Sequence, residues 1–143
     1  MADKELTILL VEDDDVDVTH IKRCLRKLRV VNPLFVASDG LIALDMLRGT
    51  NGVEKIPAPA LILLDINMPR MNGLEFLEQI RADENLRHLS VVVLTTSDEE
   101  KDIVQAYNFN VSGYIIKPIL PEKFFEMMVV IEKYWKLCER VPE

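Results

Sequence analysis

Five short runs of apolar residues, spaced along the chain, constrain the fold more than any other feature of this sequence. Each run has the length of a β-strand, and three of them are continuous rather than alternating in polarity. Continuous apolar strands are typical of a sheet that is covered on both faces. The predicted strands are Leu6–Val11, Leu34–Ala37, Leu61–Leu64, Val91–Leu94 and Tyr114–Ile116.

Amphipathic segments follow these runs and carry apolar residues at helical spacing. The fourth segment has the weakest pattern, which predicts a buried face made of Ile103, Val104 and Tyr107. The last helix is predicted to run from about Pro121, a favourable first-turn residue, to about Glu139. Alternating strands and helices predict an α/β fold, in which helices cover both faces of one parallel sheet. The apolar positions of the first three helices are Val18, Ile21, Cys24, Leu25 and Leu28; Leu41, Leu44 and Leu47; and Leu74, Leu77 and Ile80.

Composition narrows the class of protein. The 143 residues suit one domain, and the net charge of −7 without a dense basic stripe disfavours nucleic-acid binding. No apolar run reaches the ~20 residues of a membrane span, and the first residues do not resemble a signal peptide. The two cysteines, Cys24 and Cys138, have no metal-binding spacing and are expected to be reduced thiols. We therefore expect a cytoplasmic domain that binds neither nucleic acid nor membrane.

Polar side chains follow four of the predicted strands, at the point where each strand ends. Glu12, Asp13, Asp14 and Asp15 follow the first strand, Asp65 the third, Thr95 and Thr96 the fourth and Lys117 the fifth. Because parallel strands end at one edge of a sheet, and ligands bind there, these side chains should converge. Clustered carboxylates repel one another, and a divalent cation such as Mg²⁺ relieves that repulsion. The grouping predicts that Asp65 attacks a phosphoryl group whose charge the metal, the ammonium and the hydroxyl stabilise.

Other interpretations of the acidic stretch are open. The acids at positions 12–15 could simply cap the following helix and interact with its dipole. The segment Asp15–Thr19 (DVDVT) also matches the DxDxT nucleophile motif of haloacid-dehalogenase-type phosphatases, with Asp15 as nucleophile. That motif does not follow the strand directly and lies within the first predicted helix, which disfavours the phosphatase interpretation.

Four stretches of the chain resemble the receiver domain of two-component response regulators. The similarity runs from Leu6 to about Leu137 and implies a flavodoxin-like, doubly wound (βα)5 fold with strand order 2-1-3-4-5. It also implies a single receiver domain over residues 1–143, with a core at about 6–138 and no output domain. The similar stretches are LLVEDD (Leu9–Asp14), LILLDINMPRMNG (Leu61–Gly73), VVVLTTS (Val91–Ser97) and SGYIIKP (Ser112–Pro118).

The resemblance implies a phosphoacceptor and a metal site. Asp65 corresponds to the aspartate that accepts the phosphoryl group. Asp13 corresponds to a direct ligand of Mg²⁺, or of Mn²⁺ in its place, and Glu12 to an acid that acts through water. Asp65 and the backbone carbonyl of Asn67 would complete the protein's ligands to the ion.

The same resemblance implies a conformational switch. Thr95 and Tyr114 correspond to the switch hydroxyl and the switch aromatic residue, and Lys117 to the lysine of the phosphoryl site. Asn67 and Ser97 flank that site and are predicted to tune the decay of the acyl phosphate. The chain would thus be a signalling phosphoacceptor rather than a turnover enzyme. A receiver fold that is never phosphorylated is the alternative, which the complete set of competent residues disfavours.

The resemblance also implies partners. A histidine kinase or a histidine phosphotransfer protein would supply the phosphoryl group. The loop at 49–59, the LTTSDEEKDI segment and the closing IEKYW are similar to single-domain regulators that accompany phytochrome-type kinases. Output would then proceed by docking or by phosphate relay.

The last predicted helix carries more apolar surface than one sheet face requires. A second apolar set, Val130, Tyr134 and Leu137, lies beside the stripe expected to face the sheet. Either the first or fourth helix covers this set, or the chain forms a homodimer through its fourth helix, fifth strand and fifth helix. The stripe expected to face the sheet is Phe124, Met127, Met128, Ile131, Trp135 and Cys138.

Overall fold

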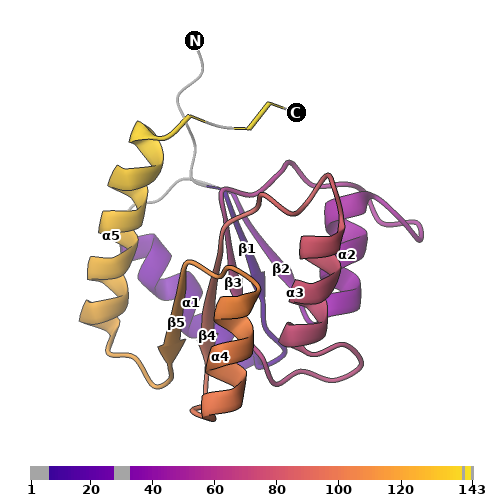
Figure 1. Cartoon of the computed structure of the whole chain (residues 1–143). Helices are drawn as coiled ribbons and strands as arrows, with labels where there is room; N and C mark the ends of the chain where they lie inside the picture. Colours follow the sequence, from indigo (N-terminus) through magenta and orange to yellow (C-terminus); the bar gives the residue numbers. More distant parts are fainter. Residues whose placement is uncertain (1–6, 28–32, 140, 143) are drawn as a thin grey trace.

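Five parallel strands form one sheet in the order β2-β1-β3-β4-β5, as predicted (Figure 1). The computed structural model describes residues 7–27, 33–139 and 141–142, so the predicted positions Leu6 and Leu28 lie outside the described residues. In register, Val11 pairs with both Ala37 and Leu64, which brings the carboxyl ends of three strands together. The strands are β1 (Ile8–Val11), β2 (Leu34–Ala37), β3 (Leu61–Leu64), β4 (Val91–Thr95) and β5 (Gly113–Ile116).

Helices cover both faces of the sheet, which confirms the doubly wound fold. Alternate residues of a strand point to opposite faces, so Leu9 and Val11 join the core under α2, α3 and α4. Ile8 and Leu10 join a second core under α1 and α5. The helices are α1 (Asp15–Lys27), α2 (Gly40–Arg48), α3 (Gly73–Ala82), α4 (Glu100–Asn108) and α5 (Pro121–Leu137).

The predicted inner faces of two helices are partly wrong. In α4 the fully buried residue is Ala106, whereas Val104 and Tyr107 are 53% and 50% exposed. A helix of nine residues offers little inward surface, and the small alanine occupies it, so the larger side chains stay outside. In α2, Leu41 is 43% exposed because Ala43 and its neighbours on the inner face fill the space against the sheet.

The start of α3 is built closely against the end of β3. Asn72 caps the helix: its side chain accepts from the backbone N of Glu75, whose carboxylate accepts from the backbone N of Asn72. The next residue, Gly73, donates its backbone N–H to the carbonyl of Ile66 at 2.8 Å. A Cβ at Gly73 would overlap the carbonyl oxygen of Asp65. The glycine therefore permits the close approach that places Asp65.

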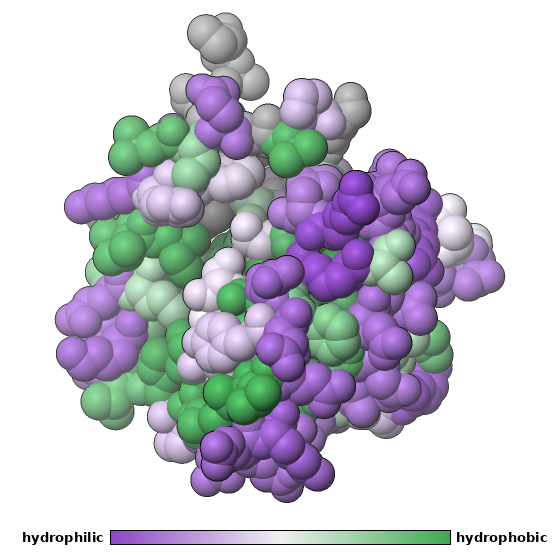
Figure 2. Space-filling view, viewed as in Figure 1, coloured by the Kyte–Doolittle hydropathy of each residue, from purple (hydrophilic) through white to green (hydrophobic). Residues whose placement is uncertain are grey.

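Helix α5 has the predicted inner stripe as far as Trp135, whereas Cys138 lies just beyond the helix end. A second apolar set on α5 is left uncovered by the described residues of the chain. Phe124 and Met128 are buried in the core shared with α1. Val130, Tyr134 and Leu137 are 65%, 70% and 86% exposed, so within the described residues neither α1 nor α4 covers them. In the view of Figure 2, apolar surface lies over α5.

No described helix is both long and apolar enough to cross a membrane.

Candidate functional site

Three predicted acids lie together at the carboxyl edge of the sheet. Pairing of β1 with β3 sets Glu12 beside Asp65, whose backbone N–H donates to the carbonyl of Val11 at 3.0 Å. Carboxylate oxygens of Glu12, Asp13 and Asp65 lie within 4.8 Å of one another. Glu12 and Asp65 are buried, and Asp13 is exposed. The structure therefore brings together the three side chains predicted to hold a metal.

The electrostatics of this cluster favour a bound cation. Burial, and next the charge of Asp65, raises the pKa of Glu12 to about 8. Asp65 is 7% exposed, and its Oδ1 has no hydrogen-bond partner among the described residues. A buried carboxylate oxygen without a donor is costly. Hard divalent cations take oxygen ligands of this kind, so the residues present fit a divalent metal.

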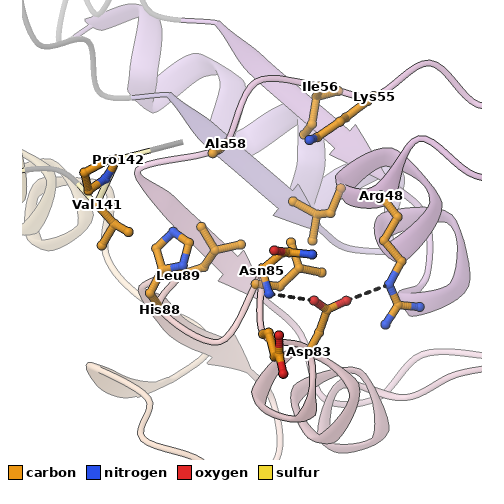
Figure 3. A pocket seen from close by; sticks show the side chains of 13 residues that line it. Arg48, Lys55, Ile56, Ala58, Asp83, Asn85, His88, Leu89, Val141 and Pro142 are labelled. Atoms are coloured by element: carbon orange, nitrogen blue, oxygen red, sulfur yellow. Dashed lines mark hydrogen bonds and ion pairs between the residues drawn. The ribbon is translucent and has the colours of Figure 1, made fainter.

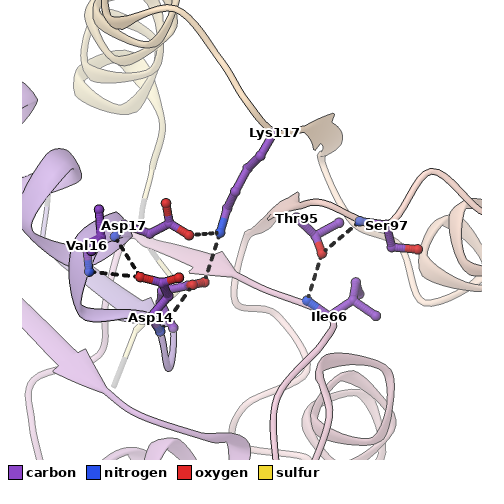
Figure 4. A network of polar contacts seen from close by, with 8 residues as sticks. Asp14, Val16, Asp17, Ile66, Thr95, Ser97 and Lys117 are labelled. Atoms are coloured by element: carbon purple, nitrogen blue, oxygen red, sulfur yellow. Dashed lines mark hydrogen bonds and ion pairs between the residues drawn. The ribbon is translucent and has the colours of Figure 1, made fainter.

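Lys117 brings a positive charge to the same edge. It follows β5, and its backbone N–H donates to the carbonyl of Thr95 at 2.7 Å. Its Nζ donates to Glu12 Oε2 at 3.2 Å and to Asp17 Oδ2 at 2.8 Å (Figure 4). Burial lowers the pKa of Lys117, but the hydrogen bond to Asp17 and the charges of Glu12 and Asp65 outweigh it, so the pKa is raised.

Asp17 was not predicted as a site residue. It lies in the first turn of α1, close to the acidic run that precedes the helix. The signal that could have found it is this position, because the first turn of a helix that follows a strand faces the same sheet edge.

The two threonines at the end of β4 lie in different environments. Thr95 is fully buried, and its Oγ1 lies 3.4 Å from the backbone N of Ile66 and of Ser97. Thr96 is exposed and lines the hollow above the acids. The resting Thr95 hydroxyl is thus held by backbone groups, and Thr96 is a second residue that sequence reasoning did not select.

Tyr114 and Ser97 form a polar connection toward α4. The Tyr114 hydroxyl donates to the carbonyl of Ser97 at 2.9 Å, and Ser97 Oγ donates to Asp102 Oδ2 at 2.6 Å. Burial raises the pKa of Tyr114. Ser97 is itself buried, so its hydroxyl points to α4 and not to open solvent.

An open hollow of about 540 Å³ lies over the acids. Asn67, Thr96 and Lys117 contribute to its wall together with the acidic run that follows β1. Within that run, Asp14 has a structural role, because its Oδ1 accepts from the backbone N of Val16 and of Asp17. The DxDxT match begins at the first residue of α1 and continues along that helix, so it does not form a strand-end nucleophile.

A separate hollow of about 380 Å³ lies at the other edge of the sheet, before β3 and β4 (Figure 3). Its principal charged contact is internal: Arg48 Nε lies 3.1 Å from Asp83 Oδ2. Asp83 Oδ1 also accepts from the backbone N of Asn85 at 2.8 Å. None of the predicted site residues lines this hollow, so the acidic edge is the candidate site.

Comparison with known families agrees with this geometry. Residues 8–129 match the response regulator receiver domain. The chain belongs to this family. As a receiver domain it is a signalling phosphoacceptor of two-component systems, a class that binds divalent metal and interacts with histidine kinases or phosphotransfer proteins. The predicted family, fold and general function are therefore confirmed, and the match favours them over the phosphatase alternative.

Known receiver domains of similar size resemble this one over most of its length. This chain is 37% identical over 128 residues to the response regulator Rcp1 of Synechocystis. The matched region covers 90% of this chain and 87% of Rcp1. The structure of the phosphorylated cyanobacterial phytochrome response regulator RcpA matches with a TM-score of 0.83 and 34% identity, over 98% and 100% of the two chains. The Mn²⁺-bound form of Rcp1 matches with a TM-score of 0.80 and 35% identity, over 96% and 99%.

Proposed function

We propose that Asp65 is the phosphoacceptor of this receiver domain, and that its acidic cluster holds Mg²⁺. The observation that carries the proposal is the buried Oδ1 of Asp65, which lacks a hydrogen-bond partner among the described residues and lies beside two further acids. Asp13 and Asp65 would ligate the ion directly, Glu12 through water, and Asn67 through its backbone carbonyl. Mn²⁺ is the alternative ion, as in the solved structure of Rcp1.

The proposed reaction transfers a phosphoryl group from a phosphohistidine of the donor protein. A carboxylate oxygen of Asp65 attacks phosphorus, the phosphorus–nitrogen bond breaks, and an acyl phosphate forms. The ammonium of Lys117, already at the site, approaches the phosphoryl oxygens, and the Thr95 hydroxyl turns toward them. When bound, the metal neutralises charge on those oxygens.

The proposed output is a change in the surface formed by α4, β5 and α5. Thr95 and Tyr114 are the proposed switch residues. Support comes from the hydrogen bond of Tyr114 to the Ser97 carbonyl, and from the bond of Ser97 to Asp102 on α4. Asn67, which lines the hollow, and Ser97 are the residues proposed to tune the decay of the phosphorylated state.

The proposed donor is a phytochrome-type histidine kinase or its phosphotransfer protein. The supporting observation is the likeness to RcpA over nearly the whole chain. We further propose that the protein works in the cytoplasm and acts by docking rather than by turnover. Cys24, a thiol buried in the core, fits a reducing compartment. A homodimer through α4, β5 and α5 would cover Val130, Tyr134 and Leu137.

Phosphorylation is tested by incubating the protein with acetyl phosphate and Mg²⁺ and measuring its intact mass. The wild-type protein should gain one phosphoryl group, and Asp65→Asn should gain none. Asp15→Asn is the control for the dehalogenase-type alternative and should be phosphorylated like wild type. An equal mass gain in Asp65→Asn would contradict the proposal, and an unmodified wild type would favour the non-phosphorylated interaction module.

A further inference from the structure

Lys117 lies between two carboxylates of different kinds. Glu12 belongs to the proposed metal cluster and lies 3.2 Å from the lysine Nζ. Asp17 lies outside that cluster and is nearer, at 2.8 Å (Figure 4). Among the contacts of the described residues, no hydrogen bond joins Lys117 to Asp65. The resting lysine is therefore tied toward α1, on one side of the hollow.

The contact between Asp17 and Lys117 is fixed at both of its ends. Asp14 caps α1 by accepting from the backbone N of Asp17, which sets the first turn of the helix. Lys117 is held through its backbone N–H by the carbonyl of Thr95. The two residues are 100 positions apart in the sequence, and the fold alone brings them together. The lysine side chain is 11% exposed, so the contact is partly shielded from water.

We propose that Asp17 is a positioning residue that holds Lys117 in reserve, and that the phosphoryl group on Asp65 displaces it as the lysine's partner. This inference rests on the proposed role of Asp65. The ammonium of Lys117 already donates to Glu12 and Asp17, so phosphoryl oxygens on Asp65 have to draw it away from α1. Asp17 then weakens the apparent affinity for the phosphoryl group, because its 2.8 Å contact with the lysine is loosened as the new contact forms.

The test compares how wild type, Asp17→Asn and Asp15→Asn respond to acetyl phosphate in Mg²⁺. Asp15 is a matched control: it lies on the same turn of α1 and lines the same hollow, and the structure describes no contact between it and Lys117. Both variants lose one negative charge, so the general electrostatic effect on an anionic donor is common to them.

Asp17→Asn should lower the half-saturating concentration of acetyl phosphate about two- to fivefold more than Asp15→Asn does, as expected for a partly exposed ion pair. The maximal rate should change little. The affinity for beryllofluoride, an analogue of the phosphoryl group, should also rise more in Asp17→Asn than in Asp15→Asn. Asp17→Glu keeps the carboxylate and should return both quantities toward the wild-type values.

A spectroscopic measurement separates positioning from a merely structural role. The side-chain ammonium signal of Lys117 in nuclear magnetic resonance, assigned with Lys117→Arg, should exchange slowly in the resting protein. Exchange should quicken in Asp17→Asn but not in Asp15→Asn.

Equal effects of Asp17→Asn and Asp15→Asn would overturn the proposal. So would a fall in maximal rate with an unchanged half-saturating concentration, which would mean that Asp17 assists the transfer and does not compete with it. A wild-type protein that takes no phosphoryl group would contradict the proposed function itself, whereas equal effects in a phosphorylated protein contradict only the role of Asp17.

Discussion

Glu12 is the carboxyl group whose protonation the fold changes most clearly. Its pKa rises from 4.5 to about 8, because burial and the charge of Asp65 disfavour the ionised form. A folded-state pKa above the unfolded value means that the protonated side chain stabilises the fold at low pH. That contribution is complete below pH 4.5 and is lost as the pH rises toward about 8.

The first prediction concerns Glu12→Gln in the metal-free protein. Because glutamine stays neutral, the variant should keep its stability over the range in which the wild type loses it. The free energy of unfolding, measured by urea denaturation at several pH values with a chelator present, should diverge between the two proteins as the pH rises from 4.5 to about 8. Added Mg²⁺ should narrow the gap by stabilising the carboxylate. Parallel pH profiles would show that folding does not raise the pKa of Glu12.

The second prediction concerns Asp13, the exposed member of the acidic cluster. Asp13→Ala should lose Mg²⁺ binding and phosphorylation while remaining folded, since it removes a ligand from the surface of the site. Its metal-free stability should equal or exceed that of wild type, because one repelling carboxylate is gone. Calorimetric titration with Mg²⁺ and thermal unfolding provide the two measurements. Normal phosphorylation of Asp13→Ala would contradict the metal site and would mean that the acidic pair only caps the following helix.

Individual site residues were predictable to different degrees. Glu12, Asp13 and Asp65 end buried strands, so the parallel sheet alone brings them together. Asp17 could not be chosen in the same way, because its contact with Lys117 depends on how the first turn of α1 is set. The choice of Thr95 over Thr96 came from the family resemblance. The role of Thr95 as the switch hydroxyl stays a prediction.

At the scale of elements, strands were easier to predict than helix faces. A continuous apolar run such as Leu61–Leu64 is typical of a strand buried on both faces, and the structure confirms that strand. Helix α4 shows the opposite case, because Ala106 carries little hydrophobic signal yet is the residue that faces inward. Short helices with several surface-exposed apolar residues do not reveal their inner face by periodicity alone.

The joint between β3 and α3 gives the third prediction. Gly73→Ala should destabilise the protein by about 1–3 kcal/mol, because the added methyl group overlaps backbone at Asp65 and Ile66. Movement of Asp65 should also slow phosphorylation. Gly113→Ala is the control, since its Cβ would meet Val92 at an ordinary contact distance of 3.9 Å. Urea denaturation measures the stability of both variants. Equal losses in Gly73→Ala and Gly113→Ala would show that the close contact of Gly73 with Asp65 does not cause the destabilisation.

At the scale of the whole molecule, an exposed apolar surface on α5 is the main unexplained feature. Val130 and Tyr134 are well exposed in the single chain, and burial of a large apolar side chain contributes ~1.5–3 kcal/mol. Replacing both with glutamate should give a folded monomer if wild type dimerises there. Thr19→Glu, on the exposed side of α1, should leave the association unchanged.

Sedimentation velocity tests this fourth prediction, with and without beryllofluoride. Wild type should sediment as a dimer at high micromolar concentration, and the double variant as a monomer. A monomeric wild type under both conditions would contradict the proposed homodimer and would leave the apolar surface of α5 available to another partner.

The parallel sheet separates the molecule into two ends that differ in their tolerance for inserted residues. The acids, Lys117 and Thr96 follow strands and Thr95 ends one, whereas the loop of residues 49–59 precedes β3 at the far end. Its tip at Asn51 and Gly52 is exposed, and both residues have positive φ, as in a tight surface turn. Exposed loop tips accept inserted residues readily. An experimenter can therefore insert a fluorescent reporter at this loop tip without touching the phosphoryl chemistry.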